Sequence, residues 1–592
     1  VSEIRQTIRD HYRANENEVL AALLPIAEIG VDAKSRAWEY ARQLVVNIRK
    51  DQEGKGGVDA LLNEFSLSTE EGVVLMCLAE ALLRVPDKDT ADSLIRDKLA
   101  NGDWSAHIGN SDSLFVNASS WGLLLTGKLV NYSDCKKKEQ FGLLKKTVGR
   151  LGEPVIRKAV RYAMKIMGTQ FVMGHNIKGA IERAVETEAK GYTYSYDMLG
   201  EGARTMRDAD RYFDAYMSAI DAIGVAARGK GPQKSPGISI KLSAIHPRYE
   251  FSHRDRVIEE LIPRLKTLAL AAKAYDIGFT VDAEEANRLD ISLDVIEAVF
   301  ADKDLDGWNG FGIAVQAYQK RGFHVIEWVR QLTLSVGRQM MVRLVKGAYW
   351  DSEVKDSQVE GYHDFPVFSR KPSTDVSYQA CAKKLLEYRD SIYPQFATHN
   401  AYTVATILEM AENLHGFEFQ RLHGMGESLY DQVVRGKNVP CRVYAPVGEH
   451  SDLLAYLVRR LLENGANSSF VNNIVDDNIP VESLLADPVE TVQSWLDKYN
   501  PQIPQSIDIY QGEEGVGRVN SIGIDLTDVD AITKMRGNLD AWFEQAKQTT
   551  VGEGELPVTN PANNNEVIGT IKHVDAADMS ALVDKAHDAF AT

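Results

Sequence analysis

Residues 441–465 read CRVYAPVGEHSDLLAYLVRRLLENG and predict a short strand, a Pro-Val-Gly turn and a helix. Ser451 is a suitable N-cap for this helix, and Gly465 a suitable C-terminal stop. One helix face is apolar. The other carries residues at i, i+3, i+4 and i+7, namely Tyr456, Arg459, Arg460 and Glu463. Two adjacent guanidinium groups beside an aromatic ring suit a carboxylate ligand, whereas a solvated face with an Arg459–Glu463 pair is the ordinary alternative.

The same alternation of strand and helix begins near residue 190. Apolar or β-branched runs alternate with amphipathic helices, and the runs cover residues 192–199, 238–243, 279–285, 310–318, 340–350, 396–401, 417–424 and 441–448. Eight βα units in roughly 270 residues predict a (βα)8 barrel, whose usual length is about 250 residues. A doubly wound open sheet is the structural alternative.

The regions on either side of the barrel have a different texture. Residues 1–173 predict an N-terminal arm and an all-α domain, and the barrel takes residues 174–475. Residues 476–545 predict a linker followed by a helical segment that begins at Val529. Residues 546–592 end in an uncapped amphipathic helix, so we expect them to be the truncated start of a further domain. The expected fold class is therefore α/β, with the all-α domain ahead of the barrel.

Composition limits the function classes. The chain has 592 residues, 44% hydrophobic and 26% charged, with a formal net charge of −17. This acidic balance provides no basic surface for nucleic acid. Four scattered cysteines without metal-binding spacing indicate a reducing, cytoplasmic compartment. The sequence contains no signal-peptide core and no apolar run of about 18 residues, so we expect no membrane span.

A barrel places its active site at the C-terminal ends of its strands. Polar residues occur at or just after most of the predicted strand ends: Glu201, Lys241, Asp282, Glu284, Gln316, Arg343, Lys346, Thr398, His399 and Tyr444. Each of them alone could be a satisfied buried polar group. Because buried charges need partners, we expect these carboxylates and cations to pair around one cavity.

Other motifs give little support to other functions. Residues 224–230, GVAARGK, match the glycine and lysine spacing of a P-loop, but Gly231 follows where a hydroxyl should bind magnesium. No GxGxxG motif opens a helix after a predicted strand, and the sequence contains no HExxH and no GxSxG motif. His399 and His423 end predicted strands and could bind metal, although a flavin-phosphate donor or a core histidine is favoured. We predict no metal site.

Several long segments occur in the order seen in a known family. They are ISIKLSAIHPRY, VDAEEANRLDISLD, AVQAYQKR, RLVKGAYWD, FATHNA, HGMGE, RVYAPVG and LLAYLVRRLLENGANSSFV. Together they resemble the proline dehydrogenase domain of bacterial proline utilization A over about residues 190–475, and the preceding helices resemble the α-domain of that family. The segment NPANNNEVIGTI resembles the opening of the family's NAD-dependent aldehyde dehydrogenase domain, whose catalytic cysteine and glutamate are not in this chain.

The resemblance implies an FAD enzyme that oxidises L-proline to Δ1-pyrroline-5-carboxylate, the first step of proline catabolism to glutamate, and passes electrons to a membrane quinone. Peripheral association with the cytoplasmic membrane face and a homo-oligomer are compatible with it. The carboxylate of proline would be bound by Lys241, Arg459 and Arg460, with Asp282 and Glu201 orienting these bases. The proline ring would be bordered by Leu344, Tyr349, Tyr444 and Tyr456.

The cofactor residues are also implied by the matching segments. Arg343 would lie beside N1 and N5 of the flavin and, with Asp282, form the catalytic pair. The rest of the FAD site would comprise Gln316, Val345, Lys346, Gly347, Ala348, Trp350, Thr398 and His399. A cation beside the flavin stabilises the reduced, anionic ring.

Two other functions remain open on the sequence. Lys241 or Lys346 could act as the Schiff-base amine of a barrel lyase. The charges could also pair with one another in a non-catalytic scaffold.

Some members of the family begin with a ribbon-helix-helix DNA-binding domain. This chain starts in the arm, without a basic module, so we expect no repressor role and no nucleic-acid partner.

Overall fold

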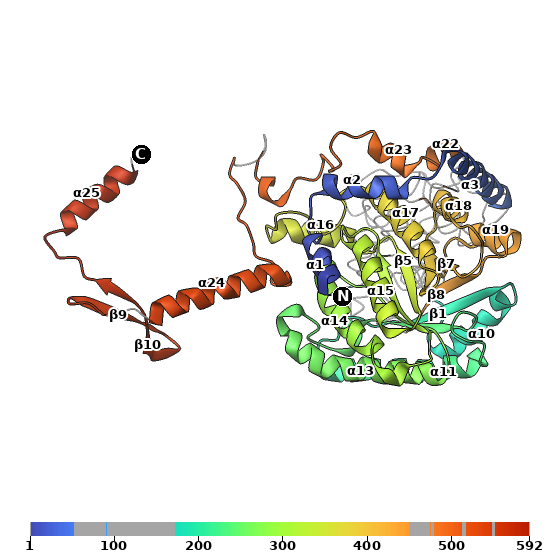
Figure 1. Ribbon diagram of the computed structural model, residues 1–592, viewed down its shortest axis with the longest axis horizontal. Coiled ribbons are helices and arrows are strands. Elements are labelled where there is room, and N and C mark those ends of the chain that lie inside the picture. Colours follow the sequence, from blue (N-terminus) through green and yellow to red (C-terminus); the bar gives the residue numbers. More distant parts are fainter. Residues whose placement is uncertain are drawn as a thin grey trace, which may run out of the picture. The chain divides into compact units, whose positions relative to one another are not determined.

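The computed structural model contains a closed barrel of eight parallel strands inside a ring of helices (Figure 1). The strands are β1 (Tyr192–Met198), β2 (Gly237–Ile240), β3 (Phe279–Val281), β4 (Phe311–Gln316), β5 (Met340–Val345), β6 (Ile392–Ala397), β7 (Glu418–Leu422) and β8 (Cys441–Val447). They pair in sequence order, and β8 pairs with β1 to close the sheet. The predicted (βα)8 barrel is confirmed, and the open-sheet alternative is wrong.

The structure describes residues 2–52, 90, 172–448, 456, 459, 470, 474, 479–511, 517–547 and 551–590. Most of the predicted all-α domain lies outside these residues. So does most of the predicted helix over 451–465, of which Tyr456 and Arg459 are described and Arg460 is not. In the described part of the chain, no helix is both long and apolar enough to cross a membrane.

The helices that cover the barrel bury apolar faces against it. They include α10 (Ile177–Glu188), α11 (Met206–Ala227), α13 (Arg254–Ala274), α14 (Leu289–Phe300), α15 (Gly322–Val336), α17 (Lys371–Glu387), α18 (Ala401–Met410) and α19 (Glu427–Lys437). Helix α11 begins with a capping box in which Thr205 and Asp208 satisfy each other's backbone amides. In α13, Val257, Leu261 and Leu265 recur every four residues and are fully buried.

Several strand boundaries differ from the sequence prediction, among them the run 279–285, which ends as β3 at Val281. The run 238–243 ends as a strand at Ile240 and continues into α12 (Leu242–Ile245), and the run 340–350 ends at Val345 before α16 (Trp350–Val359). Strand β6 begins at Ile392, four residues before the predicted start, and contains Pro394. A proline is unusual in a central strand, and the predicted run, which starts at residue 396, lies beyond it.

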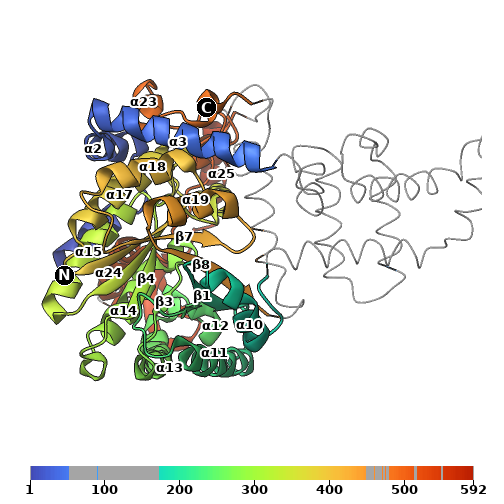
Figure 2. The same cartoon turned by 90° about the vertical axis from the view of Figure 1, so that its right-hand side faces the viewer.

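An N-terminal arm crosses the outside of the barrel. It comprises α1 (Ser2–Asp10), α2 (Glu16–Ala27) and α3 (Val31–Gln52), and Figure 2 shows α2 and α3 beside α17 and α18. Arg5 and Arg9 each bind Asp290 of α14 at 3.1 Å, and Arg321 binds the same carboxylate at 3.0 Å. These three cations outweigh the effect of burial and lower the pKa of Asp290.

Beyond the barrel, two short helices, α22 (Val481–Leu484) and α23 (Pro488–Gln493), precede irregular structure. The chain then divides into a second unit, residues 524–592. This unit contains α24 (Val529–Lys547), an antiparallel hairpin of β9 (Glu555–Asn560) and β10 (Asn563–Lys572), and α25 (Met579–Phe590). Helix α24 begins at Val529, as predicted.

The interior of the barrel is polar at the N-terminal end of the strands. Glu418 in β7 is fully buried and accepts hydrogen bonds from Arg442 Nε at 2.7 Å, Gln395 at 2.8 Å and Gln420 at 3.0 Å. Arg442 also donates to the carbonyl oxygens of Ser235 and Gln233, at 2.7 and 2.9 Å. A buried ion pair is tolerated when its remaining donors are satisfied, as these are.

Glu16 anchors α2 in a buried polar cluster. Its carboxylate accepts from Ser369 N at 2.9 Å, and its own amide donates to Tyr499 Oη at the same distance. Tyr499 in turn hydrogen-bonds Asp364, which pairs with Lys320 at 3.0 Å. Burial raises the pKa of Glu16 from its ordinary 4.5 to about 7, against the opposing effect of Lys320.

This raised pKa makes the folded state bind a proton more tightly than the unfolded state. Glu16 therefore contributes about 3 kcal/mol to the free energy of unfolding below its unfolded pKa. This contribution is lost as the pH rises through the folded pKa. We expect Glu16→Gln to remove this dependence. Urea unfolding at about pH 5 and about pH 7.5 measures it. Glu18→Gln, on the exposed side of α2, is the control, and equal pH dependence in the two variants would contradict the assignment.

Candidate active site at the C-terminal end of the barrel

Four of the predicted residues come together around the Asp282 carboxylate. Lys241 follows β2, Asp282 follows β3, Arg343 lies in β5, and Tyr444 lies in β8. The Tyr444 hydroxyl is 2.6 Å from Asp282 Oδ2 and 3.3 Å from Lys241 Nζ, and Lys241 Nζ is 3.3 Å from Asp282 Oδ2. Arg343 binds the other oxygen of Asp282 at 2.6 Å. Parallel strands that end at one edge bring these distant residues together.

Asp197 is a fifth member of this cluster that the sequence analysis missed. It lies in β1 with its side chain fully buried, 2.9 Å from Lys241 Nζ and 2.7 Å from the Tyr444 hydroxyl. Ser195, two residues earlier, also faces the barrel interior, where it contacts Arg343. Because side chains at i and i+2 share a face of a strand, the alternation in YTYSYDM could have identified Asp197.

Small polar side chains complete the environment of Arg343. Its guanidinium group donates to Gln420 Oε1 at 2.7 Å and Ser239 Oγ at 2.7 Å, and lies 3.3 Å from Ser195 Oγ. It also lies 5.0 Å from the centre of the Tyr444 ring, which suits a cation–π contact. Arg343 is therefore held rigidly in the barrel interior with its charge directed at Asp282.

Burial and charge shift the pKa values of the cluster in different directions. Burial disfavours the ionised form of Asp282, but Lys241 and Arg343 outweigh it and hold its pKa below the usual range. Burial alone would lower the pKa of Lys241, but Asp197, Tyr444 and Asp282 keep it well above its usual value. Burial and the two carboxyl groups raise the pKa of Tyr444, so the phenol remains protonated.

A second ion pair lies beside the cluster. Arg459 binds both oxygens of Glu201, at 2.6 and 2.8 Å, and lies 5.2 Å from the centre of the Tyr349 ring. Tyr456 is 5% exposed and packs with Leu199 and Met425, against which Tyr444 also packs. This side of the predicted site thus has a cation and three aromatic rings. Leu344, the fourth residue expected to border the ring, is fully buried and packs in the main core.

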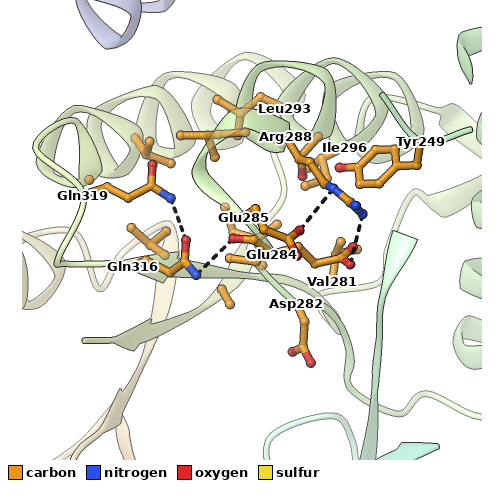
Figure 3. Close-up of a pocket in the computed structure, with 18 residues that line it drawn as sticks. Tyr249, Val281, Asp282, Glu284, Glu285, Arg288, Leu293, Ile296, Gln316 and Gln319 are labelled. Atoms are coloured by element: carbon orange, nitrogen blue, oxygen red, sulfur yellow. Dashed lines mark hydrogen bonds and ion pairs between the residues drawn. The ribbon is translucent and has the colours of Figure 1, made fainter. Parts of the chain in front are cut away.

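Gln316 lies at a small cavity between β3 and β4 (Figure 3). Gln316 Nε2 donates to the carbonyl oxygen of Glu284 at 3.2 Å, and Gln316 Oε1 accepts from Gln319 Nε2 at 2.6 Å. The cavity volume, about 20 Å³, has room for one water molecule and is too small for an organic ligand. Gln316 is therefore held by the protein itself and lies apart from the Asp282 carboxylate, which points away from the Glu284 side chain (Figure 3).

Glu284 is a buried carboxyl group on the other side of this cavity. It accepts from Ser243 N at 3.0 Å, contacts Ser243 Oγ and lies 3.5 Å from Arg288. Burial raises its pKa to about 7, although Arg288 opposes the shift. It therefore belongs to a cluster separate from that of Asp282.

The residues predicted to hold the cofactor follow β5 and β6 at the same edge of the barrel. Val345 ends β5, and Lys346, which is ion-paired with Asp375, follows it. Gly347 has a φ of +138°, and a Cβ on it would come within 2.4 Å of the Tyr318 ring. Ala348 comes next, ahead of α16. This turn therefore requires a glycine, and it exposes backbone where a side chain would not fit.

The other three cofactor candidates have protein partners. Trp350 begins α16 and donates its indole N–H to Phe368 O at 2.8 Å. Thr398 and His399 follow β6, and His399 Nε2 accepts from Leu422 N at 3.1 Å. In the neutral ring this contact leaves the proton on Nδ1.

Three family models match this chain in order. The proline utilization A proline dehydrogenase N-terminal domain matches residues 2–49, the DNA-binding domain of proline dehydrogenase matches residues 57–171, and proline dehydrogenase matches residues 180–473. The second description counts against our expectation of no nucleic-acid partner. Apart from Thr90, the residues it covers lie outside the described part of the chain.

Curated relatives resemble the whole chain. The bifunctional protein PutA of Klebsiella aerogenes is 50% identical over 606 residues, which cover 98% of this chain and 46% of that protein. The Escherichia coli K12 protein of the same name is 49% identical with the same coverage. Proline dehydrogenase 1 of Bacillus subtilis strain 168 is 27% identical over 53% of this chain and 92% of its own length. The chain spans about half the length of the first two proteins.

Solved structures agree with these relatives. A crystal structure of bifunctional proline utilization A is 49% identical, with a TM-score of 0.70 over 91% of this chain and 53% of that chain. A Bradyrhizobium japonicum proline utilization A variant is 48% identical, with a TM-score of 0.69 and the same coverage.

The Glu201–Arg459 pair should stabilise the fold more than an exposed pair of similar geometry. Its side chains are 28% and 17% exposed, and both N–H···O contacts are short. We expect a double-mutant cycle with alanine at both positions to give a coupling free energy of about 1–3 kcal/mol.

The matched control for this cycle is the Arg256–Glu260 pair in α13, whose side chains are 50% and 32% exposed at 2.9 Å. Its coupling should be about 0.2–0.5 kcal/mol. Urea unfolding of each variant supplies the free energies. Equal coupling in the two cycles would show that the Glu201 contact is as weak as a surface pair.

Proposed function

This chain belongs to the proline dehydrogenase family and corresponds to the part of proline utilization A that carries it, and we propose that it is an FAD-dependent enzyme that oxidises L-proline to Δ1-pyrroline-5-carboxylate. The observation that carries the proposal is the convergence of Lys241, Asp282, Arg343 and Tyr444 at the C-terminal end of the barrel. This site combines cations for a carboxylate with an aromatic wall for an apolar ring.

In this proposal, the proline carboxylate is bound by cations on two sides of the site. Lys241 is protonated and fixed by two carboxyl groups, and Arg459 is fixed by Glu201. Arg460 is the third cation expected from the matching segments. Charge-assisted contacts of this kind are about twice as strong as neutral hydrogen bonds. Tyr349, Tyr444, Tyr456 and Leu344 would border the ring.

The donor set of this site fits a flavin dinucleotide. The turn after β5 combines the cationic Lys346 with the open backbone at Gly347, and Arg343 adds a second cation inside the barrel beside Asp282. His423 follows β7 with its Nε2 buried and, within the residues described, without a hydrogen-bond partner. Burial lowers its pKa to about 3, so the ring is neutral. Gln316, Val345, Ala348, Trp350, Thr398 and His399 are the other residues proposed to hold FAD.

When bound, FAD would accept the hydride from the proline carbon next to nitrogen. The contribution of the protein is alignment, because Asp282, Lys241 and Tyr444 lock one another in position. Arg343 would supply positive charge where the reduced flavin becomes anionic. We further propose a membrane quinone as the electron acceptor, a cytoplasmic location with peripheral membrane contact, and a homo-oligomer.

The Schiff-base alternative is disfavoured by the protonation of Lys241. An amine nucleophile must lose its proton, and the pKa of Lys241 is held well above its usual value by the charges around it. Lys346 is likewise paired, with Asp375. The non-catalytic alternative predicts that FAD and L-proline leave the protein unchanged. The aldehyde dehydrogenase activity is proposed only for a longer chain.

The visible spectrum of the purified protein tests the proposal directly. We expect a yellow protein whose flavin absorbance is bleached by L-proline without oxygen, while D-proline serves as the control. A flavin-loaded protein that L-proline does not bleach would contradict the assignment of the substrate but not the assignment of FAD as the cofactor. A protein that stays colourless with added FAD would contradict both.

Arg459→Met should raise the KM for L-proline and leave kcat less affected, since the lost contact is made in the ground state as well. Loss of a contact to a charged group costs about 1.5–3 kcal/mol, which corresponds to a rise of about 10- to 150-fold. Steady-state kinetics measures it, with Arg256→Met in α13 as the matched loss of a surface arginine. An unchanged KM would mean that Arg459 serves Glu201 alone.

A further inference from the structure

The Tyr444 hydroxyl lies close to two carboxyl groups at once. It is 2.7 Å from Asp197 Oδ2 and 2.6 Å from Asp282 Oδ2. A phenol has a single proton to donate, and an ionised carboxylate can only accept. If both carboxyl groups were ionised, one of these short contacts would join two oxygens without a hydrogen between them. A proton must therefore lie on one of the two carboxyl groups.

The surrounding charges identify which carboxyl group holds this proton. Asp282 faces two cations, Arg343 at 2.6 Å and Lys241 at 3.3 Å. Asp197 faces Lys241 alone, at 2.9 Å, and its side chain is fully buried. Its Oδ1 has no hydrogen-bond partner among the described residues. An ionised carboxylate with one oxygen buried and unpaired is costly, so the proton belongs on Asp197.

The other groups near Asp197 do not supply a second positive charge. The Tyr216 hydroxyl of α11 accepts from Lys241 N at 3.2 Å, and burial, the largest effect, raises the pKa of this phenol, which therefore carries no positive charge. Ser195 and Ser239 are neutral and bond each other at 2.8 Å. The pKa of Asp197 is itself raised, chiefly by burial and against the charge of Lys241. This direction agrees with the hydrogen-bond geometry.

We propose that Asp197 is a positioning residue, a neutral carboxylic acid that donates its proton to the Tyr444 hydroxyl while Tyr444 donates to the ionised Asp282. The cluster then holds two cations, Lys241 and Arg343, against a single anion. The remaining positive charge is available to the carboxylate of a substrate. This last step rests on the proposed function, whereas the protonation of Asp197 does not.

Infrared spectroscopy of the holoenzyme tests the protonation without measuring activity. The difference spectrum between the parent and Asp197→Asn should contain one protonated-carboxyl C=O band that shifts in D2O, and the difference isolates it from the buried Glu16, Glu284 and Glu353. Asp282→Asn should keep a band of this kind. A parent-minus-Asp197→Asn spectrum without the band would overturn the proposal.

A second variant covers the case in which Asp197→Asn does not fold. Tyr444→Phe removes the acceptor of the proposed hydrogen bond, so the same C=O band should move to higher frequency. A band that stays in place would show that the proton on Asp197, if any, does not bond Tyr444, and would equally overturn the proposal.

Kinetics tests the consequence for substrate binding. Asparagine keeps the side chain neutral and can donate through its amide nitrogen to Tyr444, but this nitrogen, unlike Oδ2, cannot accept from Lys241. Asp197→Ala should raise the KM for L-proline by about 10-fold or more, and Asp197→Asn should recover part of this loss. Asp282→Asn should not recover the loss of Asp282→Ala, because Asp282 acts as an anion. Absence of rescue at Asp197 overturns the positioning role. A parent that L-proline does not reduce contradicts the proposed function and leaves the infrared result valid.

Discussion

The guanidinium group of Arg343 sits inside the barrel, and the strands around it are built to satisfy it. Its partners come from β1, β2, β7 and the end of β3, so one side chain ties together half of the sheet. A buried cation is tolerated only with good geometry and full hydrogen bonding. This requirement accounts for serines at 195 and 239, where larger side chains would fill the space of the guanidinium group.

The same requirement extends through the barrel. Gln420 accepts from Arg343 and donates to Glu418, which binds Arg442 near the opposite end. Buried polar groups thus run from the N-terminal to the C-terminal end of the strands, and each charge has a partner of opposite sign. Such a network fixes the site residues before any ligand arrives, which lowers the cost of ordering them later.

Much of the barrel and part of the site could be predicted from the sequence. The eight strands follow from short apolar runs, and Lys241, Asp282, Arg343 and Tyr444 follow from the rule that strand ends meet at one edge. This rule predicts which residues lie at one edge of the barrel, but it does not predict which of them contact one another. The separation of Glu284 from Asp282 was therefore not predictable. Residues 282 and 284 have the same strand parity, but β3 ends at Val281, and beyond it alternation no longer applies. Asp197 lies in an aromatic run and was missed, and the start of β6, which contains Pro394, was predicted four residues too late.

The N-terminal arm binds partners that lie far away in the sequence. Arg5 meets Asp290, 285 residues later, and the amide of Glu16 meets Tyr499, 483 residues later. On the ribosome the arm is made long before these partners exist, and contacts of such sequence separation form late. The apolar face of α2, which includes Val19, Leu20 and Leu23, packs with Val376 and Ala380 of α17. The apolar face of α2 therefore stays uncovered during synthesis until α17, more than 340 residues later, has followed it.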